Sequence, residues 1–390
     1  MAGEALTVIP IRYNLRSLMV RRTTSAMTAL VVMILFILSG FVAGLRQTVL
    51  KSAVPDTWIV LSRGTATEPD SYLTLDQYKI IKSRAQIATN AKGQPLVSPE
   101  MVTGFNPAPE EPASKVIFTH LRGVYPIAYE VHRGMKLESG RWPTGGTAEM
   151  VVGRKLAARF PNLAVGSNFR FGKRDWKIVG TFSDRDSARE SEVLTDLDLL
   201  TQDFHMGHGF NLLHVILKPG TEEAFKSSLT TDARVRVDVV SEHEFYTRQT
   251  DFVDQLRALG LAVAIILAIR SIFGAMNTMY AAVTRRTGEI GVLRALGFNR
   301  FNVLISFVSE SILLGIAGAI VGEILGIVVA TATGLSSDLM NVGSFIFRFQ
   351  MTPGAFVAGL VAGALIGALG GLLPAWRASR VGVIDSLRAV

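Results

Sequence analysis

The sequence predicts an α-helical membrane protein with four transmembrane helices and a large extracytoplasmic α/β (α+β) domain between helices 1 and 2. Four long apolar runs are the first observation. The second observation is the mean hydropathy of +0.34 and the low charged fraction of 18%. In soluble domains about a quarter of the residues are charged. Third, residues 46–254 contain 26 basic and 26 acidic side chains and therefore have no net charge. The formal net charge of +8 comes from the segments that flank the apolar runs. This pattern is typical of membrane topology signals and argues against nucleic-acid binding.

The first span is predicted at 23–45, which contains no charged residue and exceeds the roughly 20 residues that a bilayer requires. The preceding amphipathic segment, 1–22, contains four arginines that favour a cytoplasmic N-terminus: Arg12, Arg16, Arg21 and Arg22. A cleaved signal peptide is the alternative. Its apolar region is usually about 7–15 residues long, so the longer run here, ending in "GLRQT", favours an uncleaved anchor.

The next three spans are predicted at 256–283, 303–333 and 353–374. Alternation across the membrane puts two segments in the cytoplasm, the loop 284–302 and the tail 375–390. The short loop 334–352 falls outside with one basic residue, Arg348. Arginine counts agree with this orientation. We therefore expect a multi-pass protein of the bacterial cytoplasmic (inner) membrane with both termini in the cytoplasm.

The segment 46–255 is predicted to fold as a domain of its own, because it has enough apolar residues for a core. Strands are expected in "TWIVLSRG" and "KVIFTHLRGV", and a helix capped by Thr74 in "LTLDQYKIIKSRA". "TAEMVVGRKLAARF" predicts a strand followed by a helix, and "NFRFGKRDWKIVGTFSD" a hairpin with "GKRD" as its turn. The Pro- and Gly-rich stretch "GQPLVSPEMVTGFNPAPEEPASK" predicts a loop between subdomains.

Glycines recur every four residues in the third and fourth spans. The rows are Gly318, Gly322 and Gly326, and Gly359, Gly363, Gly367 and Gly371. Such rows allow close helix–helix approach inside membranes. They fit either a homodimer interface or packing within one subunit.

Catalytic and metal-binding signatures are absent from the sequence. It contains no cysteine, no G-x-x-x-x-G-K-[ST], no G-x-S-x-G and no H-E-x-x-H. "DFHMGHGFNLLH" holds His205, His208 and His214, but a metal site needs convergent ligands, so a loop with incidental histidines is favoured. We expect a non-catalytic chain without a metal or a cofactor of its own.

Arg270, Glu310 and Glu323 are charged residues deep within the predicted spans. A charge facing lipid is costly, so these residues are functional candidates. One interpretation pairs Arg270 with one of the glutamates, Glu323 being slightly favoured as the deeper. The alternative is that each charge is hydrated separately in a vestibule.

The cytoplasmic loop contains the amphipathic stretch "RRTGEIGVLRALGFNR", which begins at Arg285. Ile290, Leu293 and Leu296/Gly297 are predicted to share one helix face, with Arg286, Glu289 and Arg294 around it. A helix lying on the anionic inner leaflet is the alternative. Glu289 and the glycines at 288, 291 and 297 make a purely lipid-binding helix less favourable.

These features resemble the MacB/FtsX-type (type VII, mechanotransmission) permeases of ABC transporters. In that family the second span ends in a stretch close to "RTREIGIRMALGA", and the matching residues here are Arg286, Thr287, Glu289, Ile290, Gly291, Arg294, Ala295, Leu296 and Gly297. Glu310 matches a glutamate that opens the family's third span. "GLLPAWRASRVGVIDSLR" is similar to the family's C-terminus at Pro374, Ala375, Arg377, Ala378, Leu387 and Arg388, with Asp385 in the acidic position. Arg270 and Glu323 lie outside the pattern.

The resemblance implies a homodimeric permease driven by two copies of a separate cytoplasmic ABC ATPase, which binds the ATP and Mg. The segment 285–297 would be the coupling helix that seats on that ATPase. Export or extraction of an amphiphile (a lipid, lipoprotein, peptide or drug) is the expected function. A periplasmic membrane-fusion protein and an outer-membrane channel could complete a tripartite efflux assembly.

An FtsX-like relay that activates an extracytoplasmic cell-wall hydrolase is the alternative function. The outside domain resembles the larger exporter type, which favours export. No group of residues in the sequence supports a membrane-anchored enzyme. The sequence does not identify the substrate.

Overall fold

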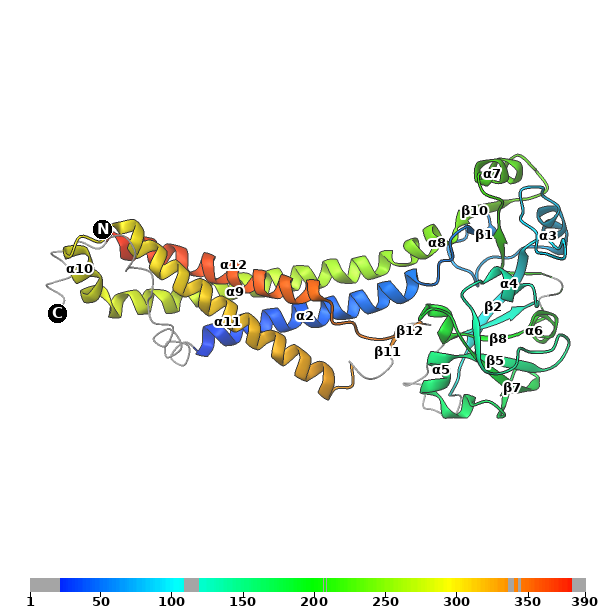
Figure 1. Ribbon diagram of the computed structural model, residues 1–390, viewed down its shortest axis with the longest axis horizontal. Coiled ribbons are helices and arrows are strands. Elements are labelled where there is room, and N and C mark those ends of the chain that lie inside the picture. The colour runs from blue at the N-terminus through cyan, green and yellow to red at the C-terminus, as the bar shows by residue number, and fades with distance from the viewer. Residues whose placement is uncertain are drawn as a thin grey trace. The chain divides into compact units, whose positions relative to one another are not determined.

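The structure is a computed structural model that describes residues 22–108, 119–205, 207, 209–335, 340–342 and 345–380 (Figure 1). The predicted N-terminal segment up to residue 21, His208 and the last ten residues of the tail lie outside the described residues. The chain divides into two compact units. The helical unit comprises Met1–Ala43, Asp254–Ser337 and Phe349–Val390, and the sheet unit comprises Gly44–Val253 and Asp338–Arg348.

Four described helices are long and apolar enough to cross a membrane, as the sequence predicted. They belong to α2 (Arg22–Leu50), α9 (Asp251–Arg285), α11 (Arg300–Ala332) and α12 (Pro353–Ser379). The short helix α10 (Thr287–Ala295) connects α9 to α11. α2 ends in the sheet unit, since that unit begins at Gly44.

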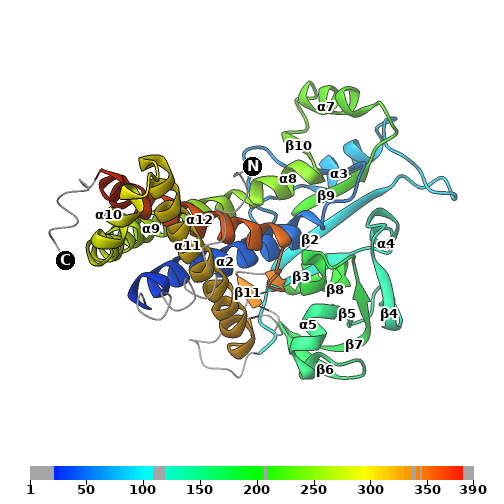
Figure 2. The same ribbon diagram turned by 60° about the vertical axis from the view of Figure 1, so that its left-hand side comes forward.

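The sheet unit is built on a mixed, 10-stranded sheet in the order β10-β1-β9-β2-β3-β8-β5-β7-β4, with β6 paired to β7 (Figure 2). β3 pairs parallel to β8 and β5 parallel to β7, whereas the other neighbours are antiparallel. The strands are β1 (Thr57–Ser62), β2 (Val97–Phe105), β3 (Thr119–Val124), β4 (Lys136–Gly140), β5 (Glu149–Gly153), β6 (Asn168–Phe171), β7 (Arg174–Ser183), β8 (Val193–Asp196), β9 (Leu212–Ile216) and β10 (Val237–Ser241).

Short helices fill the connections of the sheet. They are α3 (Leu75–Lys82), α4 (Ala128–Val131), α5 (Arg154–Arg159), α6 (Leu197–Asp203), α7 (Glu222–Thr230) and α8 (Glu242–Gln249), with 3-10 turns η2 (Pro161–Leu163) and η3 (Ala188–Ser191). The predicted cap of α3 is confirmed: Thr74 Oγ accepts the Gln77 N–H at 3.3 Å, and the Gln77 side chain accepts the Thr74 N–H at 2.9 Å. The predicted strand–helix pair β5–α5 and the hairpin β6–β7 are also present.

The predicted loop at 93–115 is wrong, because β2 occupies its first half and lies between β9 and β3 in the sheet. Pro99 suggested a loop, since proline cannot donate to a strand ladder. Its neighbour across the sheet is Leu213 of β9, whereas pairing with β3 begins only at Glu100. Pro99 therefore lies where β2 has a partner strand on one side only.

The predicted loop 334–352 contributes the strands β11 (Met340–Val342) and β12 (Phe345–Phe347), which lie in the sheet unit. Ile346 is fully buried in the main apolar core of that unit. The Ser191 Oγ accepts the Ile346 N–H at 3.0 Å. The connection between the third and fourth long helices is thus part of the folded domain.

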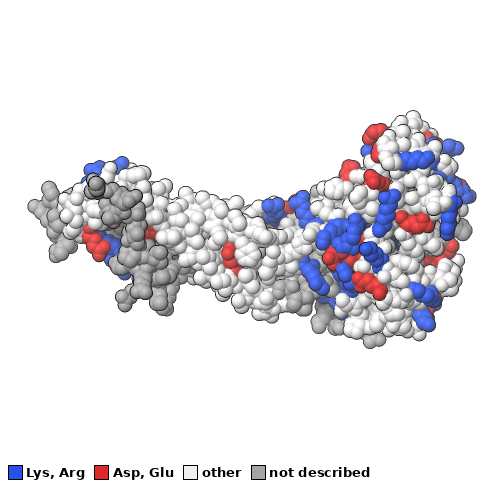
Figure 3. All heavy atoms as spheres, in the orientation of Figure 1, with Lys and Arg blue, Asp and Glu red and all other residues white. Residues whose placement is uncertain are grey.

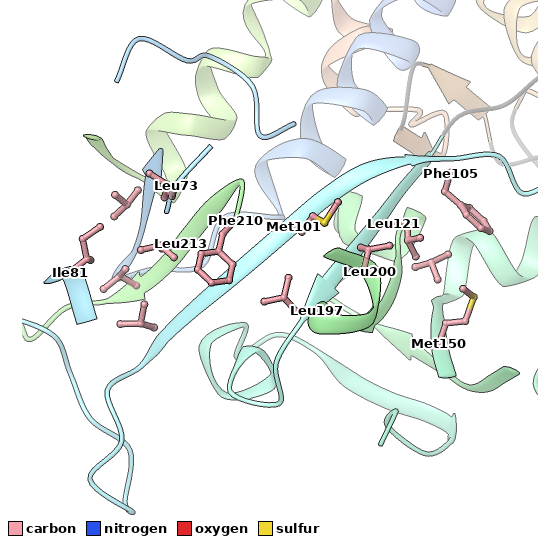
Figure 4. Close-up of a cluster of buried hydrophobic side chains, with 14 of the residues drawn as sticks. Leu73, Ile81, Met101, Phe105, Leu121, Met150, Leu197, Leu200, Phe210 and Leu213 are labelled. Carbon is pink, nitrogen blue, oxygen red and sulfur yellow. The ribbon is translucent and has the colours of Figure 1, made fainter. Parts of the chain in front are cut away.

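One face of the sheet carries that core (Figure 4). Met101 and Phe105 of β2 and Leu121 of β3 point to this side, together with Leu197 and Leu200 of α6. Alternate residues of a strand point to opposite faces, so Glu100 and Arg122 must point to the other side. Both are buried there.

Glycines hold the helices of the helical unit close together. A Cβ on Gly315 would meet the backbone of Gly363 and Gly367, and one on Gly322 would meet the backbone of Ala29 in α2. Gly318 and Gly326 are also buried. The glycine rows therefore pack helices within one protomer, which favours packing within one subunit over a homodimer interface. Figure 3 shows few charges over these helices and many over the sheet unit.

Gly363→Val should destabilise the helical unit, because the new side chain would collide with Ala319 and with the backbone of Gly315. Overpacking of this kind costs about 1–3 kcal/mol. Thermal unfolding of the purified full chain should show a lower midpoint. Gly354→Val is the matched control on the same helix, since nothing lies within 4 Å of its Cβ position. Equal unfolding temperatures for the two variants would contradict this packing.

Candidate functional site

The C-terminal end of the helix α10 is fixed by local backbone chemistry. Gly297 adopts a φ of +95°, a conformation that L side chains rarely take. Its N–H donates to the Arg294 carbonyl at 3.1 Å, and the Phe298 N–H donates to the Leu293 carbonyl at 3.2 Å. These two bonds form a Schellman motif that ends the helix before α11 begins.

The two sides of α10 differ sharply in exposure. Ile290 is 2% exposed and packs against Met279, Val303 and other apolar residues of the long helices. Leu293 and Leu296 are 42% and 72% exposed. The prediction that Ile290 shares a face with them is therefore wrong, because Ile290 anchors α10 to its own protomer.

The outward face of α10 instead contains Glu289, Val292, Leu293 and Leu296, which we call the α10 outer face. Val292 is 50% exposed and Glu289 is exposed. At about 100° per residue, these four positions fall within one third of the helix circumference. The sequence pattern missed Val292, although its spacing from Leu296 is the i, i+4 step of a single face.

Two other predicted coupling residues, Arg286 and Arg294, lie outside the α10 outer face and are partly buried. Arg286 donates to Glu310 of α11 at 3.1 Å, and both side chains are largely buried. This ion pair fixes the junction of α9 and α10 to the third long helix. Arg285 is exposed, and Arg294 is half-buried in the last turn of α10.

The predicted pairing of Arg270 is not found. Glu310 pairs with Arg286, while Glu323 is buried against Gly359, whose missing side chain makes room for the carboxylate. Arg270 is exposed on α9, and no ion pair to it occurs in the part of the chain that the structure describes. An exposed arginine on an apolar span requires protein, water or an anion beside it.

A second polar site lies in the sheet unit, on the sheet face opposite the apolar core. We call it the charged centre, and it consists of buried side chains from β2, β3, β9, η3, α8 and adjoining loops. Its members are Glu68, Glu100, Arg122, His132, Asp184, Arg189, Glu192, His214, Glu242 and Tyr246. Buried charges are tolerated only when they are paired and hydrogen-bonded.

Arg122 holds three carboxylates together. Its guanidinium donates to Glu192 at 2.7 Å, to Glu100 at 2.8 Å and to Glu68 at 2.7 Å. Burial opposes its charge, but Glu192, Glu68 and Glu100 nevertheless raise the pKa of Arg122 well above its ordinary value. Arg122 thereby connects β2, β3 and the segment before α3.

His132 is neutral, and its partners fix its tautomer. Arg189, which can only donate, contacts Nδ1 at 2.7 Å, so the proton must sit on Nε2 and point to Glu100, also at 2.7 Å. Burial and the nearby Arg189 charge lower the pKa of His132 from 6.5 to about 3. His132 thus relays a hydrogen bond from η3 to β2.

The sequence did not predict this cluster. His214 was assigned to a loop, but it is fully buried in β9, with Nδ1 3.2 Å from Glu100. His205 lies apart from it and is exposed beside Lys173, while His208 lies outside the described residues. The partners in the charged centre are far apart in sequence, and no local motif indicates them.

Glu100, His132 and His214 also bring three potential metal ligands within 4.8 Å of one another. The hydrogen bonds disfavour this use. A cation on His132 Nε2 would move the proton to Nδ1, where it would face the Arg189 donor. Glu100 is moreover shared with Arg122. We interpret the group as part of an ion-pair network.

Comparisons with known proteins agree with this architecture. Residues 24–232 match the MacB-like periplasmic core domain, and residues 261–383 match the FtsX-like permease C-terminal domain. A macrolide export ATP-binding/permease protein MacB from Mannheimia succiniciproducens is 27% identical over 69% of this chain and 43% of its own length. The chain thus spans less than half of that relative.

A further relative and a solved structure are also similar to parts of the chain. An uncharacterized ABC transporter permease from Methanocaldococcus jannaschii is 23% identical over 65% of this chain and 66% of its own length. The solved periplasmic region of MacB from Actinobacillus actinomycetemcomitans aligns with 52% of this chain and 96% of its own, with 14% identity and a TM-score of 0.37.

The low pKa of His132 predicts that the protein loses stability as the pH falls below 6.5. The unfolded chain binds this proton near pH 6.5, whereas the folded chain does so only near pH 3, so the unfolded state gains protons first. From pH 6.5 to 5 the expected loss is about 1.5 kcal/mol. Denaturant unfolding of the purified full chain at several pH values would measure it.

His132→Gln should flatten this pH dependence, because a neutral amide also offers one acceptor and one donor. His243→Gln on the exposed face of α8 is the control and should retain the slope of the original protein. An unchanged slope in His132→Gln would show that other groups cause the dependence.

Proposed function

The chain belongs to the family of MacB-like and FtsX-like ABC transporter permeases, and on this premise we propose that it is the transmembrane subunit of an ATP-driven exporter. Its partner would be a cytoplasmic ABC ATPase in two copies, which binds the ATP and Mg. This chain would hydrolyse nothing itself. It would couple ATP-driven motion of the partner to a change in the extracytoplasmic sheet unit.

The α10 outer face is the observation on which the proposal depends. Three exposed apolar side chains, Val292, Leu293 and Leu296, lie together on a short helix between two spans. An exposed apolar cluster marks an interaction surface. Ile290 and the Arg286–Glu310 pair fix the other side of α10 to the long helices, so a force applied to the outer face would reach α9 and α11 directly.

A protein partner suits this face better than the lipid surface does. Helices that lie on anionic leaflets display Lys and Arg beside their apolar stripe. Here the acidic Glu289 lies on the apolar face itself, with Arg294 half-buried beside it. An ATPase groove with an apolar floor and a basic rim would complement it.

We propose that a second copy of the chain covers the exposed face of α9. Leu259, Ile266 and Phe273 are 65%, 66% and 64% exposed and recur every seven residues. Seven-residue spacing of apolar side chains is the pattern of two long helices packed side by side. The glycine rows are used within the protomer, so the homodimer would use a different surface of the helices, and this face of α9 is the one proposed.

Export or extraction of an amphiphilic substrate is the proposed activity, and the match of the sheet unit to the MacB-like periplasmic core domain supports it. A membrane-fusion protein and an outer-membrane channel would extend the path in a cell with two membranes. The FtsX-like relay remains the second candidate, since residues 261–383 match that family. ATP-dependent release of a fluorescent amphiphile from proteoliposomes would support export; its absence, with activation of a cell-wall hydrolase, would support the relay.

Leu296→Asp should abolish capture of the ATPase, because it places a charge at the most exposed apolar position of the α10 outer face. A pull-down from cell membranes with the tagged full chain would measure this, with at least a tenfold loss expected. Ala295→Asp is the matched control, since Ala295 is exposed but lies about 100° away around the helix.

The double variant Glu289→Lys with Leu293→Asp provides an independent check of the same surface. If it retains both ATPase binding and coupled ATP hydrolysis, the assignment of α10 as the coupling helix is wrong.

Arg270→Leu should reduce ATP hydrolysis by the reconstituted complex while expression stays normal. We propose that Arg270 faces the second copy or a hydrated space between the copies, because lipid would penalise its charge. Ile269→Leu, at the neighbouring exposed position, is the control. Unchanged hydrolysis and expression in Arg270→Leu would remove a functional role for this residue.

A further inference from the structure

The charged centre reaches the two chain segments that connect the sheet unit to the spans. Glu242 is the first residue of α8, and α8 leads along the chain into α9. Val54 follows the end of α2 by four residues. The Val54 N–H donates to Glu242 Oε2 at 2.8 Å. The Glu242 carboxylate thus joins the segment that follows α2 to the helix that leads into α9.

The other oxygen of Glu242 is paired with Arg189 of η3, and both side chains are fully buried. Arg189 also donates to the Tyr246 hydroxyl, one turn along α8, at 3.2 Å. The neighbouring Ala188 N–H donates to Ser52 Oγ at 3.0 Å. The turn η3 therefore contacts the segments on both sides through three separate hydrogen bonds.

From Arg189 the hydrogen bonds continue into the centre of the sheet. Arg189 donates to His132, His132 donates to Glu100 of β2, and Arg122 of β3 donates to Glu100. Each of these contacts is 2.7 or 2.8 Å long. An unbroken series of side chains thus joins Val54 and α8 to the middle strands.

We propose that the Glu242–Arg189 pair is the joint that transmits displacement of α2 and α9 to the sheet unit, with Glu242 as its positioning residue. This inference rests on the proposed function, in which ATP moves the helices. A buried ion pair suits a joint because its geometry is directional, and separating the partners would strand charges away from water. Apolar packing in the same place could slide.

The chain has no cysteine, so one introduced cysteine can be labelled uniquely. Glu223→Cys in α7 is suitable, because the Glu223 side chain is 90% exposed and contacts Lys226 at the surface. Spin–spin distances between the two copies would be measured by pulsed EPR in the full complex with the ATPase. We expect the distance distribution to shift when a hydrolysis-blocked ATPase binds ATP.

Glu242→Gln should remove this shift while ATPase binding is unchanged. Glu244→Gln is the matched control, because Glu244 lies on the same helix, is exposed and pairs with Arg248 on the surface. It should leave the shift intact. A purely structural role for Glu242 would lower the unfolding temperature but leave the ATP-induced shift of the folded molecules unchanged, and that result would overturn the proposal.

Glu242→Gln leaves Arg189 without its main partner and could impair folding. The double variant Glu242→Gln with Arg189→Gln leaves neither charge of the pair behind, and it should likewise lose the shift. A shift equal to that of the original protein in the folded double variant would overturn the joint. If the original protein itself shows no ATP-dependent shift although the ATPase binds, the proposed function is wrong instead.

Discussion

The pairing of charges on one face of the central sheet is the constraint on which the sheet unit depends. β2, β3 and β9 each direct apolar side chains to the core and charged or imidazole side chains to the opposite face. That second face is covered by protein, so water cannot solvate Glu100, Arg122 or His214. Each charge must find its partner inside the fold, which fixes the positions of η3, α8 and the segment after α2.

The helical unit obeys a different constraint. Its helices have little to gain from apolar burial when the surroundings are apolar, so close backbone contact and a few polar contacts must hold them. Gly315, Gly322 and Gly363 provide the close contacts. The Thr28–Ser271 hydrogen bond at 3.1 Å joins α2 to α9, and the Ser311 hydroxyl donates to the Gly367 carbonyl at 2.7 Å. Leu259, Ile266 and Phe273 on α9 are instead exposed apolar side chains, which is consistent with a role between copies.

Periodicity explains which features the sequence could predict. The long helices and α3 have strong local signals, either a long apolar run or a capping box, and all are present. β2 was missed because its alternating residues include Pro99 and Glu100, so it resembles a loop when read alone. The two sides of α10 were misassigned because an amphipathic pattern does not say whether an apolar residue faces its own protomer or a partner, and Ile290 does the former.

The charged centre could not be predicted for a more general reason. Arg122 and Glu68 are 54 residues apart in sequence, and Arg189 and Glu242 are 53 apart. In the sequence alone, each of these residues looks like an ordinary surface charge, because its partners are brought near only by the arrangement of the strands.

A buried ion pair is weak evidence for stability, because the cost of dehydrating both partners cancels much of their attraction. Such a pair instead fixes the relative position of its two side chains, because a guanidinium donates to carboxylates only along the directions of its N–H bonds. In this fold the geometry is concentrated where the chain enters and leaves the sheet unit. A domain that needed stability alone could have filled that space with apolar side chains, as it does on the other face of the same strands and beside the charged centre at Val124 and Leu194. The burial of these charges next to the segments that enter and leave the sheet unit is therefore the structural reason to regard the charged centre as a means of transmission.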